Sequence, residues 1–84
     1  SQLVAPRAAP LSGKEESELK EILRTINKVE ARKKELERFL ANPGPGVAGD
    51  RGKILAWSNE FAEIEKTIQE NVSRWELLES KRSL

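Results

Sequence analysis

Two apolar stripes with helical spacing, separated by one segment rich in glycine and proline, constrain this chain of 84 residues more than any other feature. The members of each stripe are alternately three and four residues apart, as at the a and d positions of a heptad repeat. The first stripe consists of Leu19, Ile22, Ile26, Val29, Lys33, Leu36 and Leu40. The second consists of Ile54, Trp57, Phe61, Ile64, Ile68, Asn71, Trp75 and Leu78. Each stripe therefore predicts one long amphipathic helix.

Local signals predict where these helices begin and end. Ser12-Gly13-Lys14-Glu15 matches the capping box, which starts a first helix over about residues 13–41. Pro43 ends that helix, because the residue before a proline is pushed out of the helical region. Residues 42–49 are turn residues throughout, and Asp50 is the predicted cap of a second helix over about 51–80.

Two long amphipathic helices joined by so short a turn must fold back on each other to cover both stripes. The predicted fold class is all-α: a two-helix antiparallel coiled-coil hairpin over residues 12–84, preceded by a flexible N-terminal tail at 1–11. The stripes allow two registers. One places Leu40 opposite Trp57 and Ile22 opposite Trp75, and the other, shifted by one heptad, places Ile22 opposite Ile68.

Some stripe residues invite a functional interpretation, but a structural one is favoured. Trp57, Phe61 and Trp75 could form a stacking surface, yet their stripe positions predict a role in the core. Lys33 and Asn71 are predicted to control the register, since single polar residues at such positions fix alignment at a cost in stability. The Lys33 ammonium is expected to reach water.

The composition argues against catalysis and against metal or cofactor binding. The chain contains neither cysteine nor histidine, which removes thiol chemistry, imidazole catalysis and the usual zinc sites. Its carboxylates, such as Glu60 and Glu63, are expected on a solvated helix without a pocket to shift their pKa. No apolar run approaches the roughly 20 residues that span a bilayer, so no membrane partner is expected and a cytoplasmic location is the default.

The basic residues are the main candidates for binding. Residues 20–38 carry seven bases and four acids, whereas residues 54–79 carry two bases and six acids. A ridge repeats every four residues along the first helix, with Arg38 further along and four supporting cations elsewhere. The ridge residues are Lys20, Arg24, Lys28 and Arg32, and the supporting ones are Arg51, Lys53, Lys81 and Arg82. The alternative is a solvated face whose charges pair with acids of the same or the other helix; the pattern leaves both open.

Three segments of the chain also carry a family resemblance. The chain opens with Leu11-Ser12-Gly13-Lys14-Glu15, turns at Ala41-Asn42-Pro43 and closes with Arg74-Trp75-Glu76-Leu77-Leu78-Glu79. In this order, around a first helix rich in glutamate and leucine, these segments resemble the C-terminal domain of ABC-F ATPases of the Uup type. The resemblance covers about residues 11–79.

The resemblance implies a module that follows two ATP-binding cassettes and a linker in a cytoplasmic protein. The Uup-type domain is associated with DNA binding, and the wider family acts on ribosomes. The predicted function is therefore non-catalytic binding of DNA or ribosomal RNA, mainly through phosphate contacts, by a monomer that also contacts the cassettes of its parent chain. One alternative is a structural or protein-interaction hairpin that docks on the ribosome or within the parent ATPase. The other is an arm that contacts tRNA.

Overall fold

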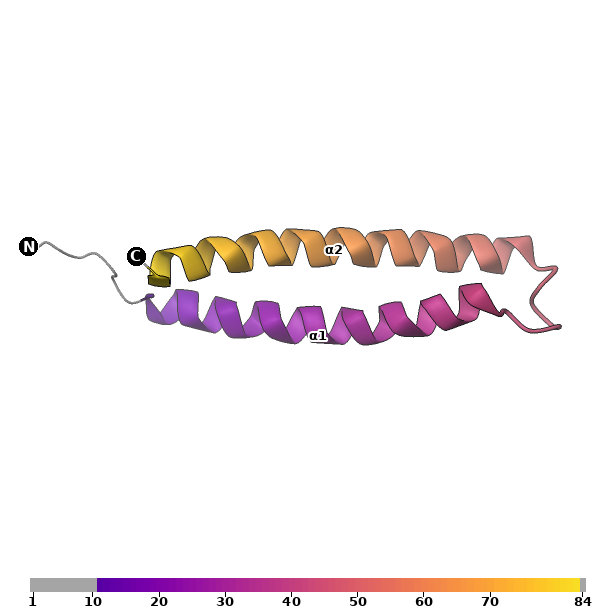
Figure 1. Cartoon of the computed structure of the whole chain (residues 1–84), viewed down its shortest axis with the longest axis horizontal. Coiled ribbons are helices and arrows are strands. Elements are labelled where there is room, and N and C mark those ends of the chain that lie inside the picture. Colours follow the sequence, from indigo (N-terminus) through magenta and orange to yellow (C-terminus); the bar gives the residue numbers. More distant parts are fainter. Residues whose placement is uncertain (1–10, 84) are drawn as a thin grey trace, which may run out of the picture.

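The computed structural model describes residues 11–83 and contains two helices, α1 (Gly13–Ala41) and α2 (Arg51–Ser83). They run antiparallel and side by side, and the turn between them lies at the far end from both termini of the hairpin (Figure 1). The hairpin is a narrow rod, and its longer helix, α2, spans about 50 Å at about 1.5 Å per residue. The predicted all-α hairpin is confirmed, whereas the tail predicted at residues 1–11 lies, apart from Leu11, outside the described residues.

The capping box at the start of α1 forms as predicted. The Ser12 hydroxyl accepts from the backbone N–H of Glu15 at 3.1 Å, and the Glu15 carboxylate accepts from the backbone N–H of Ser12 at 3.0 Å. Two donors that the first helical turn leaves without partners are thereby satisfied. At the other end, Asn42 donates its backbone N–H to the Arg38 carbonyl at 3.0 Å, and Pro43 prevents further helix.

The turn between the helices is held by its own backbone. The N–H groups of Val47 and Ala48 both donate to the Gly44 carbonyl, at 3.2 and 2.9 Å. Gly44 adopts a φ of +87°, in the left-handed region that glycine enters without strain. Asp50 caps α2 as predicted, since its carboxylate accepts from the backbone N–H of Lys53 at 3.0 Å. The helix then continues to Ser83, three residues beyond its predicted end.

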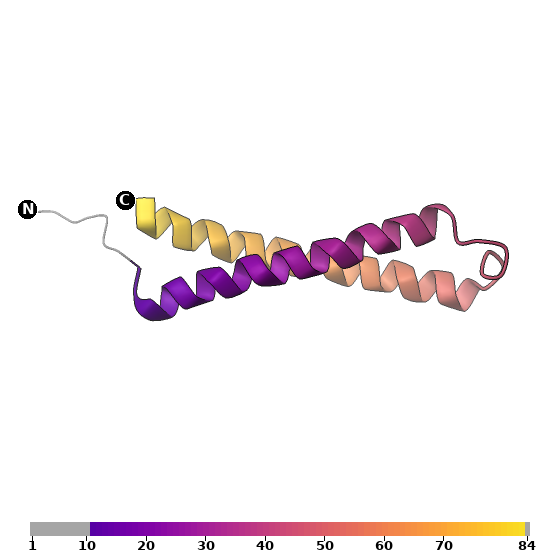
Figure 2. The same ribbon diagram turned by 90° about the horizontal axis from the view of Figure 1, so that it is seen from below.

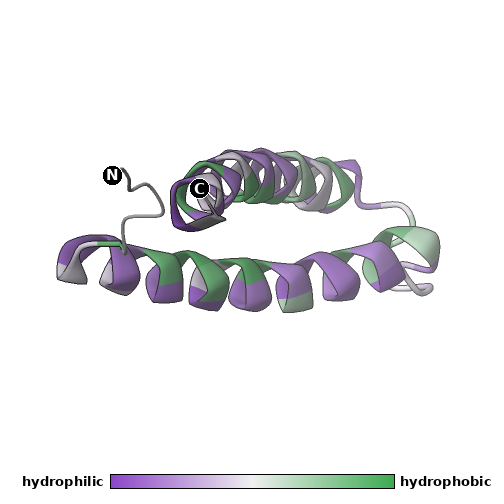
Figure 3. Ribbon diagram, turned by 60° about the vertical axis from the view of Figure 1, so that its left-hand side comes forward, coloured by the Kyte–Doolittle hydropathy of each residue, from purple (hydrophilic) through white to green (hydrophobic). Residues whose placement is uncertain are grey.

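The two stripes meet along the rod, and all fifteen of their residues are buried or half-buried. Apolar and polar residues alternate along both helices (Figure 3), and the helices cross at a shallow angle (Figure 2). Such a crossing is expected for a coiled-coil seam. Leu36 and Leu78 have no exposed surface.

Contacts at the end of the hairpin opposite the turn show which of the two predicted registers the helices adopt. Leu19, Ile22 and Leu78 form a buried cluster against which Trp75 packs. Ile22 therefore lies near Trp75, as in the first of the two registers that the sequence allows. Leu11 belongs to the same cluster with 9% of its surface exposed, so its assignment to the flexible tail was wrong.

The aromatic residues of the second stripe contribute to the interface, as predicted. The Trp57 ring lies 5.0 Å from the ring of Phe39, centroid to centroid, with the planes tilted by 31°. Trp75 packs on the cluster described above, and Phe61 lies beneath the ammonium of Lys33 at 5.6 Å. None of the three is exposed in the manner of a stacking platform.

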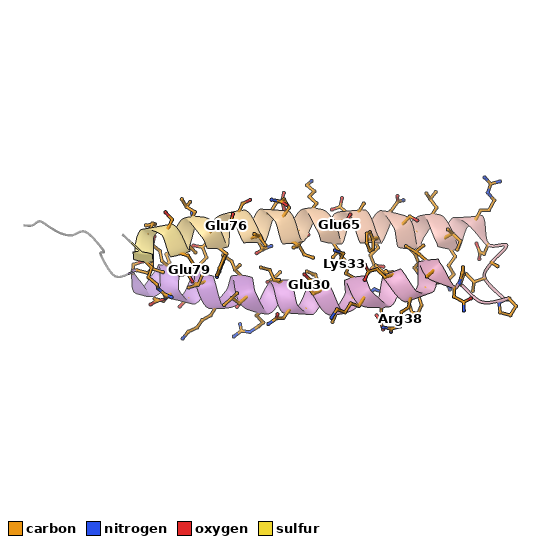
Figure 4. The ribbon with its side chains drawn as sticks, in the orientation of Figure 1. Glu30, Lys33, Arg38, Glu65, Glu76 and Glu79 are labelled. Carbon is orange, nitrogen blue, oxygen red and sulfur yellow. The ribbon has the colours of Figure 1, made fainter. Side chains whose placement is uncertain are left out.

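The two polar residues of the stripes behave differently. Lys33 lies between the helices (Figure 4), and its ammonium is 3.8 Å from the Glu65 carboxylate on the opposite helix. The Lys33 side chain is therefore only partly exposed to water, with 26% of its surface accessible. Asn71 donates its side-chain amide to the Thr67 carbonyl of its own helix at 2.8 Å. A cross-helix polar contact that could hold the register is therefore present at Lys33, and register control by Asn71 stays a prediction.

Candidate nucleic-acid interface

The four cations of the predicted ridge do not share one face of α1. Lys20, Arg24 and Lys28 are exposed, but Arg32 is half-buried at the edge of the helix interface. The cause is helix geometry: four residues advance by about 400°, so each step turns about 40° past a full turn. Over the three steps from Lys20 to Arg32 the ridge winds by about 120°, which brings its last member against α2.

Arg32 is the most heavily engaged cation in the described part of the chain. Its guanidinium donates twice to Glu60 of α2, at 2.7 and 3.0 Å, and once to Glu35 of its own helix at 2.8 Å. Such bidentate geometry fixes both partners in one orientation. The Arg32 guanidinium lowers the pKa of Glu60, and the two carboxylates raise the pKa of Arg32. In this structure Arg32 therefore joins the helices.

Lys81 and Arg82 also join the helices. Lys81 pairs with Glu15, and Arg82 pairs with Glu16 at 2.5 Å, so the last turn of α2 is tied to the first turn of α1. A bidentate pair between Arg74 and Glu18, at 2.8 and 2.9 Å, continues this series. The structure thus places these two predicted binding residues at the open end of the hairpin, about the length of α1 away from Arg51 and Lys53 at the turn.

Two of these pairs favour the charged form of their carboxylates, those of Glu15 and Glu18. The ammonium of Lys81 and the cap hydrogen bond from Ser12 lower the pKa of Glu15. The Arg74 guanidinium lowers the pKa of Glu18 in the same way. Around neutral pH the cations at this end of the hairpin are consequently paired with carboxylates, and their charges are already compensated.

A second group of cations does share one face. We call the α1 outer face the set of exposed bases that point away from α2, namely Lys20, Arg24, Lys28, Lys34 and Arg38. Arg24 and Arg38 each lie midway between two stripe residues and so are opposite the interface. Figure 4 shows Arg38 on the side of α1 that faces away from α2. From Lys20 to Arg38 the face extends over about 27 Å, taking about 1.5 Å per residue.

Most charges on the α1 outer face are uncompensated. Arg24 pairs with Glu21 at 2.6 Å, and both side chains of that pair are about two-thirds exposed. Among the described residues, no ion pair involves the other four bases of the face. An exposed pair such as Arg24 with Glu21 contributes little to stability and can exchange its carboxylate for another anion. The face can therefore hold a row of phosphates.

Lys34 and Arg38 show what counting by four residues misses. Arg38 was predicted only to lie further along the ridge and Lys34 was not predicted at all, yet both lie on the face that the first three ridge residues occupy. Position relative to the apolar stripe was the signal that could have found them, since each residue turns about 100° from its neighbour.

Within residues 11–83 we find no cluster of three or more histidine, cysteine or carboxylate side chains with the geometry of a metal site. Neither helix of this part is long and apolar enough to cross a membrane.

Comparison with known proteins gives one family. A family model described as the ABC transporter C-terminal domain matches residues 10–80. Comparisons with curated proteins and with solved structures gave no significant match.

Proposed function

The chain belongs to the ABC transporter C-terminal domain family, and from this membership and the α1 outer face we propose that it is a non-catalytic module that binds the phosphate backbone of a nucleic acid. Within the family we assign it to the Uup type of ABC-F ATPase, because of its opening and closing motifs around Ser12 and Trp75. DNA or ribosomal RNA would be the ligand, and the parent ATPase would supply the ATP-binding cassettes.

The observation that carries the proposal is the row of exposed bases along α1. If α1 served only to pack against α2, its outward side would not need an excess of positive charge. Equal numbers of acids and bases, paired within the helix, would keep that side equally soluble. Five bases over about 27 Å instead create a strip of positive potential that attracts a polyanion. Its members are lysines and arginines, the side chains that supply many of the contacts to phosphate oxygens in protein–DNA complexes, so the strip fits the phosphate backbone.

The test is the salt dependence of binding to the whole chain. Fluorescence anisotropy would follow a labelled DNA duplex and a structured RNA at several salt concentrations. Each phosphate contact contributes about 0.9 to the slope of log affinity against log salt on duplex DNA. Changing Arg24→Gln and Lys28→Gln together should therefore flatten that slope by about 1.8 and weaken binding at low salt.

A matched pair of single variants separates this face from general charge. Lys28→Gln and Lys66→Gln make the same change in charge and in side chain, each at an exposed helical position without an ion pair among the described residues. Lys66 lies on α2, midway between Ile64 and Ile68 and so opposite the interface. Lys28→Gln should reduce affinity and Lys66→Gln should not. Equal effects of the two, or no binding of the unchanged chain at low salt, would overturn the proposal.

A further inference from the structure

The hairpin turn ends in a shallow apolar hollow that the proposed function does not use. It is lined by Ala48 from the turn and by Arg51, Ile54, Leu55 and Ser58 from the first turns of α2. We call this set the tip hollow. The Val47 and Ala48 N–H groups donate to the Gly44 carbonyl, which fixes the backbone of the turn from which Ala48 lines the hollow. The hollow is thus built on a turn with a defined backbone.

Leu55 is an exposed apolar residue that takes no part in the interface between the helices. The helix interface is served by its neighbours Ile54 and Trp57, whereas Leu55 has 61% of its surface exposed, more than Leu23 or Leu77. A single exposed leucine is common on protein surfaces and carries no meaning by itself. Here it stands beside a hollow that Ile54 and Ala48 also line, so an apolar side chain entering the hollow would cover all three.

The charges around the tip hollow are positive. Arg51 lines it and Lys53 follows, and among the described residues neither forms an ion pair. The one nearby acid in the turn, Asp50, is occupied as the cap of α2. The first turn of α2 contains no acid, in contrast to that of α1 with Glu15 and Glu16. Cations are unfavourable at this end of a helix. The Lys53 ammonium lies over the Trp57 ring, 5.8 Å from its centroid, so Arg51 is the cation here that the fold does not explain.

The tip is also the part of the molecule that can reach a partner. Residues 11 and 83, where the described chain starts and stops, lie at the opposite end of the hairpin, about the length of α2 away, and the turn projects beyond both helices (Figure 1). A phosphate backbone offers nothing apolar to Leu55 or Ile54. An acidic protein segment that presents an apolar side chain would satisfy both features of the hollow.

We propose that the tip hollow is a docking site for an acidic protein segment that inserts one apolar side chain between Ala48, Ile54 and Leu55 while its carboxylates face Arg51. This site is separate from the α1 outer face and does not depend on nucleic-acid binding.

The experiment is an NMR titration of the whole isotope-labelled chain with two synthetic helical peptides. One carries glutamate and leucine on a single face, and the other carries glutamate with alanine in place of leucine. The glutamate–leucine peptide should shift the backbone amide signals of Ala48, Arg51, Leu55 and Ser58. Leu55→Ala should weaken its binding by about tenfold, since the leucine contact is lost.

Leu77→Ala is the matched control, because Leu77 is a comparably exposed leucine, at 53%, near the other end of α2. It should leave the titration unchanged, and circular dichroism should show both leucine variants folded. The proposal is overturned if no tip signal moves, if the glutamate–alanine peptide binds equally well, or if Leu55→Ala binds like the unchanged chain. It is also overturned if duplex DNA shifts the same signals with the same affinity, since the tip would then be a phosphate site.

Discussion

Truncation of Leu36 to alanine tests the structure most directly. Leu36 is one of two side chains in the described part of the chain with no exposed surface, and it lies in the half of α1 nearer the turn. The change removes a buried isopropyl group without disturbing the backbone, because leucine and alanine both favour helix. Any loss of stability is therefore a measure of packing between α1 and α2.

The expected loss can be bounded. Leucine-to-alanine changes in protein cores cost about 2–5 kcal/mol, and the cost is lowest where neighbours can move into the space. A hairpin with only two helices can close part of that space, so we expect about 2–3 kcal/mol. For a domain of this size each kcal/mol lowers the melting temperature by about 4–8 °C, which gives a decrease of roughly 8–24 °C.

Thermal and urea unfolding followed by circular dichroism would measure the change. Leu55→Ala provides the control, because it makes the same substitution where 61% of the residue's surface is exposed and should change stability by less than about 0.5 kcal/mol. Unfolding should also be independent of protein concentration if the hairpin is a monomer. Equal losses for the two variants would refute the packing inferred for Leu36.

Two other predictions concern the ion pairs and the turn. The pKa of Glu15, Glu18 and Glu60 is lowered by Lys81, Arg74 and Arg32 respectively; a lowered pKa in the folded state contributes stability that is present above the ordinary glutamate pKa and is lost as the pH falls through the lower folded values. The melting temperature should therefore drop between about pH 6 and about pH 3 at low ionic strength, less steeply in Arg74→Gln, and a constant value would contradict the role of these pairs. Gly44→Ala should destabilise the hairpin by about 1–2 kcal/mol in urea unfolding, because the φ of Gly44 is +87°. Gly46→Ala is the control: its surroundings are equally open and its φ is not positive, so this change should be neutral or slightly stabilising. Equal effects of the two changes would show that the turn conformation is wrong.

Most of the fold could be predicted because its signals are local. The capping box at Ser12, the proline after Asn42 and the aspartate before α2 each act within a few residues, and the structure has all three. The register could not be predicted, since a shift by one heptad again brings apolar residues opposite apolar ones. It is visible only in contacts between residues far apart in the chain, including those of Leu11, which follows Pro10 and has no periodic neighbour before it.

The candidate site was harder to predict because its cations have two roles. Arg32 occurs in the same four-residue series as Lys28, yet one side chain is tied to Glu60 and the other is exposed. Sequence spacing identifies neighbours along a helix, but which of them face the partner helix depends on the winding of the row relative to the stripe. The exposed row that continues through Arg38 becomes clear only when α2 is in place.

The ion pairs between the helices do not account for the unequal charge of the two halves. If mutual attraction were the whole reason for that inequality, most of the seven bases at residues 20–38 would pair with acids of α2. Among the described residues only Arg32 and Lys33 do so, with Glu60 and Glu65, and the other three cross-helix pairs use acids that precede residue 20. The five remaining bases of this segment are those of the α1 outer face, and none of them pairs with α2. A surplus that the fold leaves on the outward side of one helix is better explained by an anionic ligand than by the stability of the hairpin.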